Sequence, residues 1–256
     1  MLTLTPIPAF SDNYIWVLHD QSDALAVDPG DAAPLLAYLD AHRLRLRAVL
    51  ITHCHADHVG GLPALLQQQP HLRIVGPSTL EIATEPVGNG QTVSALGLDF
   101  AVSAVPGHTL DHLAYYATPW LFCGDTLFGA GCGRLFEGTP AQMLASLQAL
   151  ATLPPDTQVC PAHEYTLANL QFAQQAEPFN HDIKQRFEHD KTRRAHHYPT
   201  LPCKLSLELA TNPFLRCNQP AIRQVIEQKE KRIFSSEVEI FAALRRWKDG
   251  FKAQDI

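Results

Sequence analysis

One segment constrains this chain more than any other: Thr52-His53-Cys54-His55-Ala56-Asp57-His58. It follows the apolar run at 48–52 and precedes a pair of glycines, so it lies where a buried strand is expected to end. Imidazole and carboxylate groups are good ligands for zinc and similar divalent ions. On a turn at this point, His53 and His55 can point to one metal ion while Asp57 and His58 point to another. The sequence therefore predicts a sheet that carries a metal site at the end of a strand.

Other predicted strands are also followed by potential metal ligands: His108 after 98–105, Asp125 after 120–124, and His163 at the end of 158–162. Single histidines are usually solvated surface groups, but this spacing at successive strand ends is not typical of such loops. Because neighbouring strands can gather residues at one edge of a sheet, we expect these three side chains to join the first group.

The remaining cysteines and histidines are weaker candidates. Cys54 lies between two ligands, so we expect its side chain to point away from theirs as a small buried hydrophobic group. His112 follows His108 by four residues, and we favour a structural or ligand-orienting role for it over coordination. The other histidines lack such a context and are predicted to lie on the surface: His19, His42, His71, His181, His189, His196 and His197.

The alternation of short apolar runs with helical spacing predicts sheets covered by helices. Strands are predicted at 13–19, 24–28, 48–52, 72–76, 98–105, 113–117, 120–124 and 158–162. Helices are predicted at 34–44, 62–69 and 141–150. After residue 165 the pattern becomes helical, with apolar positions at 167–173 and 222–226 and a capping box at Ser236 and Glu239. We therefore predict an α+β fold with domains at 1–165 and 166–256.

Composition narrows the classes of function. Hydrophobic residues make up 46% of the 256 residues and charged residues 18%, which is typical of a globular protein. A net charge of −6 gives no general attraction to nucleic acid, so no nucleic-acid partner is expected. No apolar run approaches the length of a membrane span, and the start has no signal-peptide pattern. Six scattered cysteines without a CxxC pair favour reduced thiols and a cytoplasmic location.

The order HxHxDH, His, Asp, His resembles the metallo-β-lactamase superfamily over residues 1–165. The resemblance implies an αββα sandwich in which His53, His55 and His108 hold one metal ion and Asp57, His58 and His163 the other. Asp125 would bridge the two ions, and Asp57 would also orient the nucleophile. Two divalent ions can share a hydroxide, lower the pKa of its parent water and polarise a carbonyl group. Zinc is expected, although iron and manganese can use the same ligands.

Further stretches look like the glyoxalase II family, the hydroxyacylglutathione hydrolases, and they extend the resemblance to nearly the whole chain. These stretches are 124–139, 161–165, 212–216 and 244–251. The likeness implies hydrolysis of S-2-hydroxyacylglutathione, with S-D-lactoylglutathione giving D-lactate and glutathione in methylglyoxal detoxification. The residues that match the family's glutathione-binding positions are Arg134, Tyr165, Arg245 and Lys248. Phe136 stands where some members have tyrosine, so one hydrogen bond to the peptide is expected to be missing.

Other functions are compatible with parts of the pattern. An iron-dependent persulfide dioxygenase shares the THxHADH segment, but such enzymes lack the long helical extension with a basic terminal pair. A nuclease of the same superfamily would need an extended basic stripe, which this acidic chain lacks. A non-enzymatic metal-binding scaffold is disfavoured because all the expected ligands are present. We expect a monomer whose partner is a small-molecule glutathione thioester.

Overall fold

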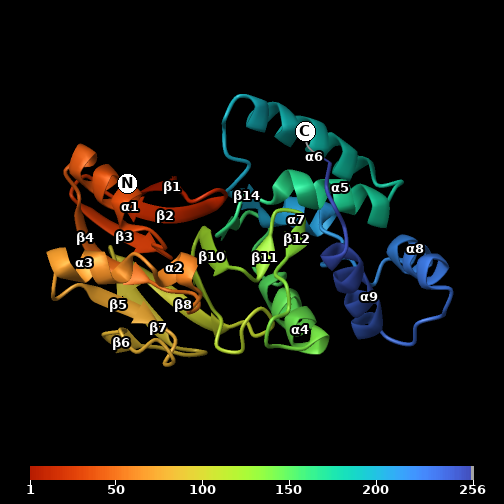
Figure 1. Ribbon diagram of the computed structural model, residues 1–256, viewed down its shortest axis with the longest axis horizontal. Coiled ribbons are helices and arrows are strands. Elements are labelled where there is room, and N and C mark those ends of the chain that lie inside the picture. The colour runs from red at the N-terminus through yellow and green to blue at the C-terminus, as the bar shows by residue number, and fades with distance from the viewer. Residues whose placement is uncertain (255–256) are drawn as a thin grey trace. The chain divides into compact units, whose positions relative to one another are not determined.

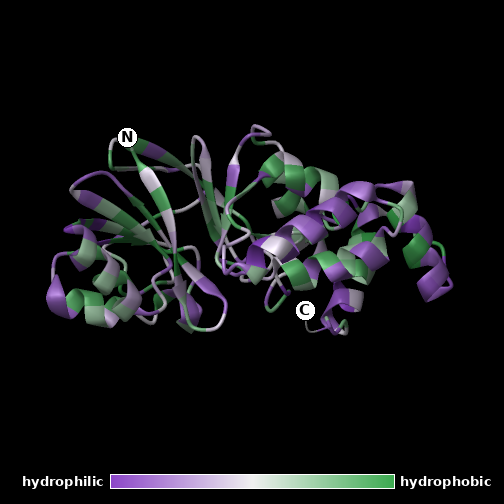
Figure 2. Ribbon diagram, turned by 90° about the horizontal axis from the view of Figure 1, so that it is seen from above, coloured by the Kyte–Doolittle hydropathy of each residue, from purple (hydrophilic) through white to green (hydrophobic). Residues whose placement is uncertain are grey.

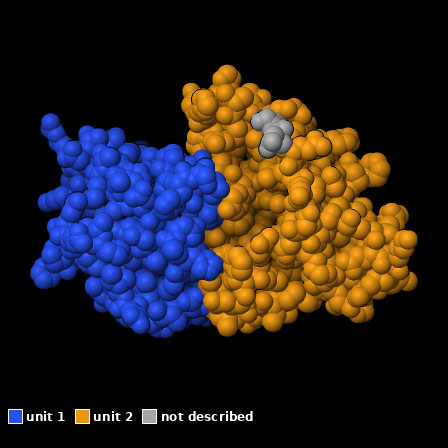
Figure 3. Space-filling view, in the orientation of Figure 1, with its two compact units in different colours: residues 1–105, 111–124, 160–163 blue, residues 106–110, 125–159, 164–256 orange. Residues whose placement is uncertain are grey.

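A computed structural model describes residues 1–254 of the chain (Figure 1). The chain divides into two compact units, coloured separately in Figure 3. Unit 1 comprises residues 1–105, 111–124 and 160–163, and unit 2 comprises residues 106–110, 125–159 and 164 onward. The chain therefore passes between the units several times.

The first sheet of unit 1 has the strand order β1-β2-β3-β4-β5-β6. Its strands are β1 (Thr3–Ala9), β2 (Asn13–His19), β3 (Asp23–Val27), β4 (Arg45–Leu50), β5 (Arg73–Gly76) and β6 (Glu85–Pro86). The first three strands pair antiparallel, whereas β3 to β6 pair in parallel. Parallel strands end at the same edge of a sheet, so the residues that follow β3 and β4 are brought together.

Three helices belong to the same part of the chain: α1 (Ala32–His42), α2 (Ala56–Val59) and α3 (Leu62–Gln68). Asp31 caps α1 by accepting a hydrogen bond from the backbone of Ala33. Leu35 on α1 and Leu65 on α3 are buried in one hydrophobic cluster with the strand residues, so both helices pack on the sheet. Full burial of one such side chain stabilises the fold by roughly 1.5–3 kcal/mol.

The second sheet of unit 1 is formed by β7 (Thr92–Ala95), β8 (Leu98–Ala104), β9 (Leu113–Ala117), β10 (Trp120–Gly124) and the end of β13 (Gln158–Pro161). Strands β7 to β10 form an antiparallel meander. The buried indole of Trp16 in the first sheet donates a hydrogen bond to the Pro161 carbonyl in the second, at 2.8 Å. This bond ties the two sheets of unit 1 together.

Unit 2 carries a small hairpin and most of the helices. Its elements are β11 (Leu127–Phe128), β12 (Gly131–Cys132), α4 (Pro140–Leu150), α5 (Thr166–Ala176), α6 (His181–Ala195), β14 (Cys203–Lys204), α7 (Leu205–Thr211), α8 (Pro220–Glu230) and α9 (Glu237–Asp249). Strand β14 pairs with the beginning of β13. The helices carry hydrophobic and hydrophilic stretches side by side, shown in green and purple in Figure 2, as expected for helices packed on one face.

The predicted strands are confirmed: three have the predicted bounds, and the others differ by one to three residues at their ends. The capping box is also confirmed, because Ser236 accepts a hydrogen bond from the Glu239 backbone and Glu239 reaches back to Ser236. Helices α6 and α7 and strands β1 and β7 were not predicted. The division at residue 165 stays a prediction. Within residues 1–254 no helix is long and apolar enough to cross a membrane.

Candidate metal centre

The loop after β4 is fixed by Asp28, which directly follows β3. The Asp28 carboxylate accepts hydrogen bonds from the Thr52 backbone at 2.8 Å and from the Thr52 hydroxyl at 2.7 Å. Tyr115 donates a further hydrogen bond to the Ile51 carbonyl at 2.7 Å. Because these groups are buried, their hydrogen bonds hold the start of the histidine-rich loop in one conformation.

Three histidines of the loop lie against one another. The Nε2 atom of His53 is 3.0 Å from Nδ1 of His55, and the His53 and His58 ring centres are 4.0 Å apart. His112 stacks on His53 with ring centres 4.6 Å apart. His53, His58 and His112 are fully buried. The loop therefore gathers several imidazole rings, each with nitrogen atoms that can bind a metal ion, in one buried place.

Asp57, His58 and His163 offer ligand atoms that all lie within 4.8 Å of one another. One oxygen of Asp57, Oδ2, is 3.4 Å from Nε2 of His58 and also 3.4 Å from Nε2 of His163. The same oxygen accepts a hydrogen bond from the Asn13 side chain at 3.0 Å. Hydrogen bonds with His163 and His58 lower the pKa of Asp57 far below its usual range, although burial opposes this shift. Asp57 is therefore a carboxylate ready to bind a cation.

Glycine is required where α2 approaches the loop after β3. A Cβ atom on Gly30 would lie 1.8 Å from the carbonyl oxygen of Asp57. Any side chain at this position would displace the backbone that carries Asp57. Gly30 therefore contributes to the ligand group through its lack of a side chain.

Unit 2 carries the remaining two predicted ligands, His108 and Asp125. The Nε2 atom of His108 is 3.3 Å from Oδ2 of Asp125. On the other side of the ring, Nδ1 of His108 lies 2.8 Å from the Arg134 carbonyl oxygen. Both ligands are buried and adjacent to each other within this unit.

Three of the histidines have an acceptor oxygen behind Nδ1. Nδ1 of His58 lies 3.1 Å from Asp28, Nδ1 of His163 lies 2.7 Å from Asp12, and Nδ1 of His108 faces the Arg134 carbonyl. Carboxylate and carbonyl oxygens only accept hydrogen bonds, so each of these oxygens can take the Nδ1 proton of its histidine. The opposite nitrogen, Nε2, faces Asp57 or Asp125 and is the ring atom that remains for a metal ion. This is how metal-binding histidines are usually oriented, so these residues fit a divalent metal ion.

The predicted substrate residues Arg134, Arg245 and Lys248 gather around Asp249. The Asp249 carboxylate is 3.4 Å from Nε of Arg134 and 3.1 Å from Nη2 of Arg245. Burial, followed by the charge of Arg245, lowers the pKa of the Lys248 ammonium group. Three cations around one carboxylate leave an excess of positive charge in this part of unit 2.

These substrate residues differ in how accessible they are. Arg245 is only 7% exposed, and its Nη1 donates a hydrogen bond to the Cys132 carbonyl at 2.8 Å. Tyr165 is 36% exposed, with its ring packed edge-on to Phe128, and Phe136 is 60% exposed beside His108. Arg245 is thus largely occupied by internal contacts, whereas the tyrosine and phenylalanine rings reach solvent.

Several residues that contact the candidate ligands were not predicted from the sequence. Asp28, Asp12 and Asn13 orient His58, His163 and Asp57 respectively. Asp28 follows an apolar run, as Asp125 does, so its position at a strand end was a usable signal. Asp12 and Asn13 lie far from their partners along the chain, and nothing local distinguishes them.

Cys54 lies apart from the ligand groups. Its sulfur is 3.6 Å from the Thr79 hydroxyl and 3.8 Å from the Asp111 carboxylate. The side chain is half-buried and belongs to none of the groups of potential ligands found within residues 1–254. It therefore points away from the ligands, as predicted, but is less buried than predicted.

Comparisons with known proteins match this architecture. The model of the metallo-beta-lactamase superfamily matches residues 9–163, and that of the hydroxyacylglutathione hydrolase C-terminus matches residues 164–251. The chain is 48% identical to a hydroxyacylglutathione hydrolase of Nitrosomonas eutropha and 50% identical to one of Photobacterium profundum. Each alignment covers 98% of this chain and 100% of the relative.

A solved structure supports the fold. The crystal structure of BLEG-1 B3 metallo-beta-lactamase superimposes with a TM-score of 0.63 at 23% identity, covering 84% of this chain and 99% of that one. The predicted α+β fold, a metallo-β-lactamase fold with a C-terminal helical region, is thereby confirmed. The chain belongs to the hydroxyacylglutathione hydrolase family, the glyoxalase II enzymes of the metallo-β-lactamase superfamily.

Proposed function

We propose that this chain hydrolyses the thioester of S-2-hydroxyacylglutathione, with S-D-lactoylglutathione as the substrate and D-lactate and glutathione as products. The observation that carries the proposal is the contact between His108 and the Arg134 carbonyl. It joins a predicted metal ligand to a predicted glutathione-binding cation. A thioester carbonyl and a peptide carboxylate can then be recognised by neighbouring parts of one site.

We propose that two divalent ions, zinc in the first place, are held by the ligand sets that the family resemblance implies. His53, His55 and His108 form one set and Asp57, His58 and His163 the other, with Asp125 shared. The acceptor oxygens that face Nδ1 of His58, His108 and His163 support this assignment. Bound there, the ions would supply an activated water and a polarised carbonyl group.

The chain's own residues would then bind and orient the substrate. Asp57, kept ionised by its two histidine neighbours, can accept a hydrogen bond from the attacking water and so set its direction. Arg134 and Lys248 can pair with glutathione carboxylates, and Tyr165 can contact the peptide. Arg245 adds its charge to the cluster while its hydrogen bonds go to Cys132 and Asp249.

An assay with S-D-lactoylglutathione tests the proposal directly. Purified protein should release glutathione, detected as a new thiol, and a chelator should abolish the release until zinc is restored. A metal-replete protein that consumes oxygen with a glutathione persulfide, and leaves the thioester intact, would show that the chain is a persulfide dioxygenase instead.

We further propose a monomeric protein that works in the cytoplasm, with domains at 1–165 and 166–256. None of the six cysteines, which all lie within residues 1–254, forms a disulfide bond, and this supports a reducing compartment. The two family models meet at residues 163 and 164, which supports the domain division. Sedimentation of the purified protein at several concentrations tests the oligomeric state.

A further inference from the structure

A short hairpin separates two residues assigned to the reaction. Asp125 lies just before β11 and Arg134 just after β12, with a two-residue turn between the strands. The open end of the hairpin is tightly packed, because a Cβ atom on Gly133 would lie 1.9 Å from the Asp125 carbonyl oxygen. The position of this hairpin therefore determines the positions of Asp125 and Arg134.

Asn212, at the end of α7, holds both strands of the hairpin. Its side-chain amide nitrogen donates hydrogen bonds to the Phe128 carbonyl at 3.2 Å and to the Gly131 carbonyl at 2.9 Å. Asn212 is fully buried, so these backbone oxygens have no water to replace the amide. Removal of the amide would take a buried hydrogen-bond donor away from a carbonyl on each strand, which is costly.

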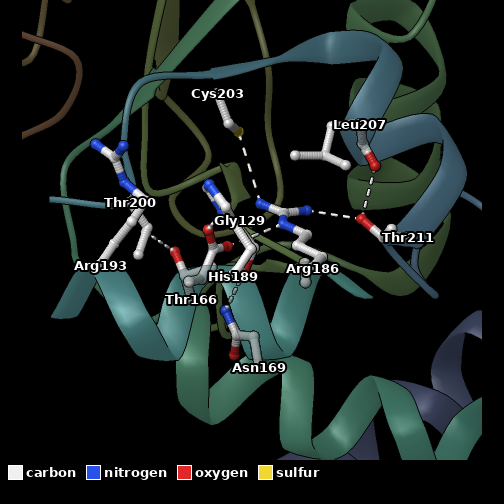
Figure 4. A network of polar contacts seen from close by, with 12 residues as sticks. Gly129, Thr166, Asn169, Arg186, His189, Arg193, Thr200, Cys203, Leu207 and Thr211 are labelled. Carbon is white, nitrogen blue, oxygen red and sulfur yellow. Dashed lines mark hydrogen bonds and ion pairs between the residues drawn. The ribbon is translucent and has the colours of Figure 1, made fainter. Parts of the chain in front are cut away.

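The turn of the hairpin is held from two further helices. Asn169 on α5 donates a hydrogen bond to the Gly129 carbonyl at 3.0 Å, a contact visible in Figure 4. The Ala130 backbone donates to Glu208 of α7 at 2.9 Å. Ala130 has a φ of 52°, a left-handed conformation that is unfavourable for alanine and that these contacts hold in place.

A buried ion pair supports Glu208 in turn. Its second carboxylate oxygen lies 2.6 Å from Nη2 of Arg186 on α6, and Arg186 also donates to the Thr211 hydroxyl at 2.7 Å (Figure 4). Burial alone would lower the pKa of Arg186, but the charge of Glu208 raises it. Arg186 also lines a cavity of about 650 Å³ with Asp190 and Cys203. The chain of polar contacts that holds the hairpin thus extends through Glu208 to Arg186 on α6.

We propose that Asn212, Asn169 and Glu208 are positioning residues that hold the β11–β12 hairpin so that Asp125 and Arg134 keep the geometry needed for metal binding and catalysis. The inference rests on the roles proposed above for Asp125 and Arg134. It assigns a function to buried polar side chains that touch neither of those residues. Shifts of about 1 Å in a catalytic group can cost about 100-fold in rate, so a loosened hairpin should be visible in kinetics.

Asn212→Ala tests the proposal, with zinc affinity measured by competition with a chromophoric chelator. Partners behind metal ligands are typically worth about 10–100-fold in affinity, so we expect a loss in this range. At saturating zinc, kcat for S-D-lactoylglutathione should still fall by about tenfold or more. Asn169→Ala removes the hydrogen bond to the Gly129 carbonyl but leaves those from Asn212 in place, so it should show smaller losses in the same direction. This second variant keeps the test usable if Asn212→Ala does not fold.

Glu177→Gln is the matched control. Glu177 is buried in the same unit and pairs with Arg216 at 2.7 Å, but it has no contact with the hairpin. This variant should lower the melting temperature while zinc affinity and kcat stay within about twofold of wild type. Two outcomes would overturn the proposal. In the first, Asn212→Ala and Asn169→Ala fold and keep the zinc affinity and kcat of the wild type. In the second, all three variants lose zinc affinity and kcat equally. A wild-type protein that leaves the thioester intact refutes the proposed function, whereas the zinc comparison still decides the positioning role.

Discussion

His108 donates its Nδ1 proton to the carbonyl oxygen of Arg134, 2.8 Å away, and so faces Asp125 with Nε2. A single backbone oxygen thereby joins a histidine that we propose binds metal to the start of a loop that we propose binds substrate. A side-chain substitution at Arg134 leaves this oxygen in place. The charge of Arg134 and the orientation of His108 can therefore be tested separately.

Asp125→Asn should lower metal content and kcat together. The substitution replaces a negative ligand, assigned to both ions, by a neutral amide that binds cations more weakly. Metal analysis of the purified variant beside its kinetics checks this. Asp156→Asn is a control, because that carboxylate is 85% exposed and pairs only with the surface residue Lys204. Full metal content with normal turnover in Asp125→Asn would remove Asp125 from the bridging role.

Asp12→Ala should weaken metal binding although Asp12 is not itself assigned as a ligand. The variant removes the acceptor that fixes the Nδ1 proton of His163 at 2.7 Å, so the ring can rotate or change tautomer. We expect a loss of about 10–100-fold in metal affinity or in kcat/KM. Chelator competition and kinetics measure the two quantities. Asp12→Asn, whose amide oxygen can still accept this bond, should recover part of the loss; no recovery would argue for a charge effect instead.

Cys54→Ala should keep most of the activity. The thiol contacts Thr79 and Asp111 and is absent from the groups of potential ligands within the described part of the chain. Thioester hydrolysis by the metal-loaded variant provides the measurement. A nearly complete loss of activity at full metal content would point to a thiol nucleophile.

The candidate metal ligands could be picked out from the sequence because each is marked locally, by an apolar strand that ends in histidine or aspartate. The residues that orient them could not be predicted in the same way. Asp12 reaches His163 across 151 positions of sequence, and only the folded chain brings the two together. Local pattern carries no information about such partners.

Helix α6 was missed for a related reason. Its buried face includes Ile183 but also Arg186 and Asp190, so charged residues occupy positions where a helical pattern predicts apolar ones. For the basic pair Arg245 and Lys248 on α9, the pattern predicted the helix but not the burial of its side chains. Helical spacing placed Arg245 and Lys248 side by side, yet it could not show that Arg245 is buried against Cys132. Burial of a charge depends on its partners, which are distant in sequence.

The double variant Arg134→Ala/Lys248→Ala should raise KM for S-D-lactoylglutathione more than it lowers kcat. The two cations lie near Asp249 and are proposed to bind glutathione carboxylates, remote from the thioester carbonyl. Such binding is similar in the ground and transition states, so its loss appears mainly in KM. Each interaction with a charged group is worth roughly 1.5–3 kcal/mol, or about 10–100-fold in kcat/KM.

A second substrate and a matched variant distinguish specific binding of glutathione by Arg134 and Lys248 from a general effect of their charge. A small thioester without the peptide should be hydrolysed equally by wild type and by the double variant, because it offers no carboxylate to the cations. Arg246→Ala removes a cation from the same helix, but Arg246 pairs with Glu230 at 2.9 Å and is 60% exposed, so KM should not change. Salt should raise the wild-type KM by screening the cations and should affect the double variant less. An unchanged KM for the glutathione thioester in the double variant would mean that Arg134 and Lys248 are surface charges and that glutathione is bound elsewhere.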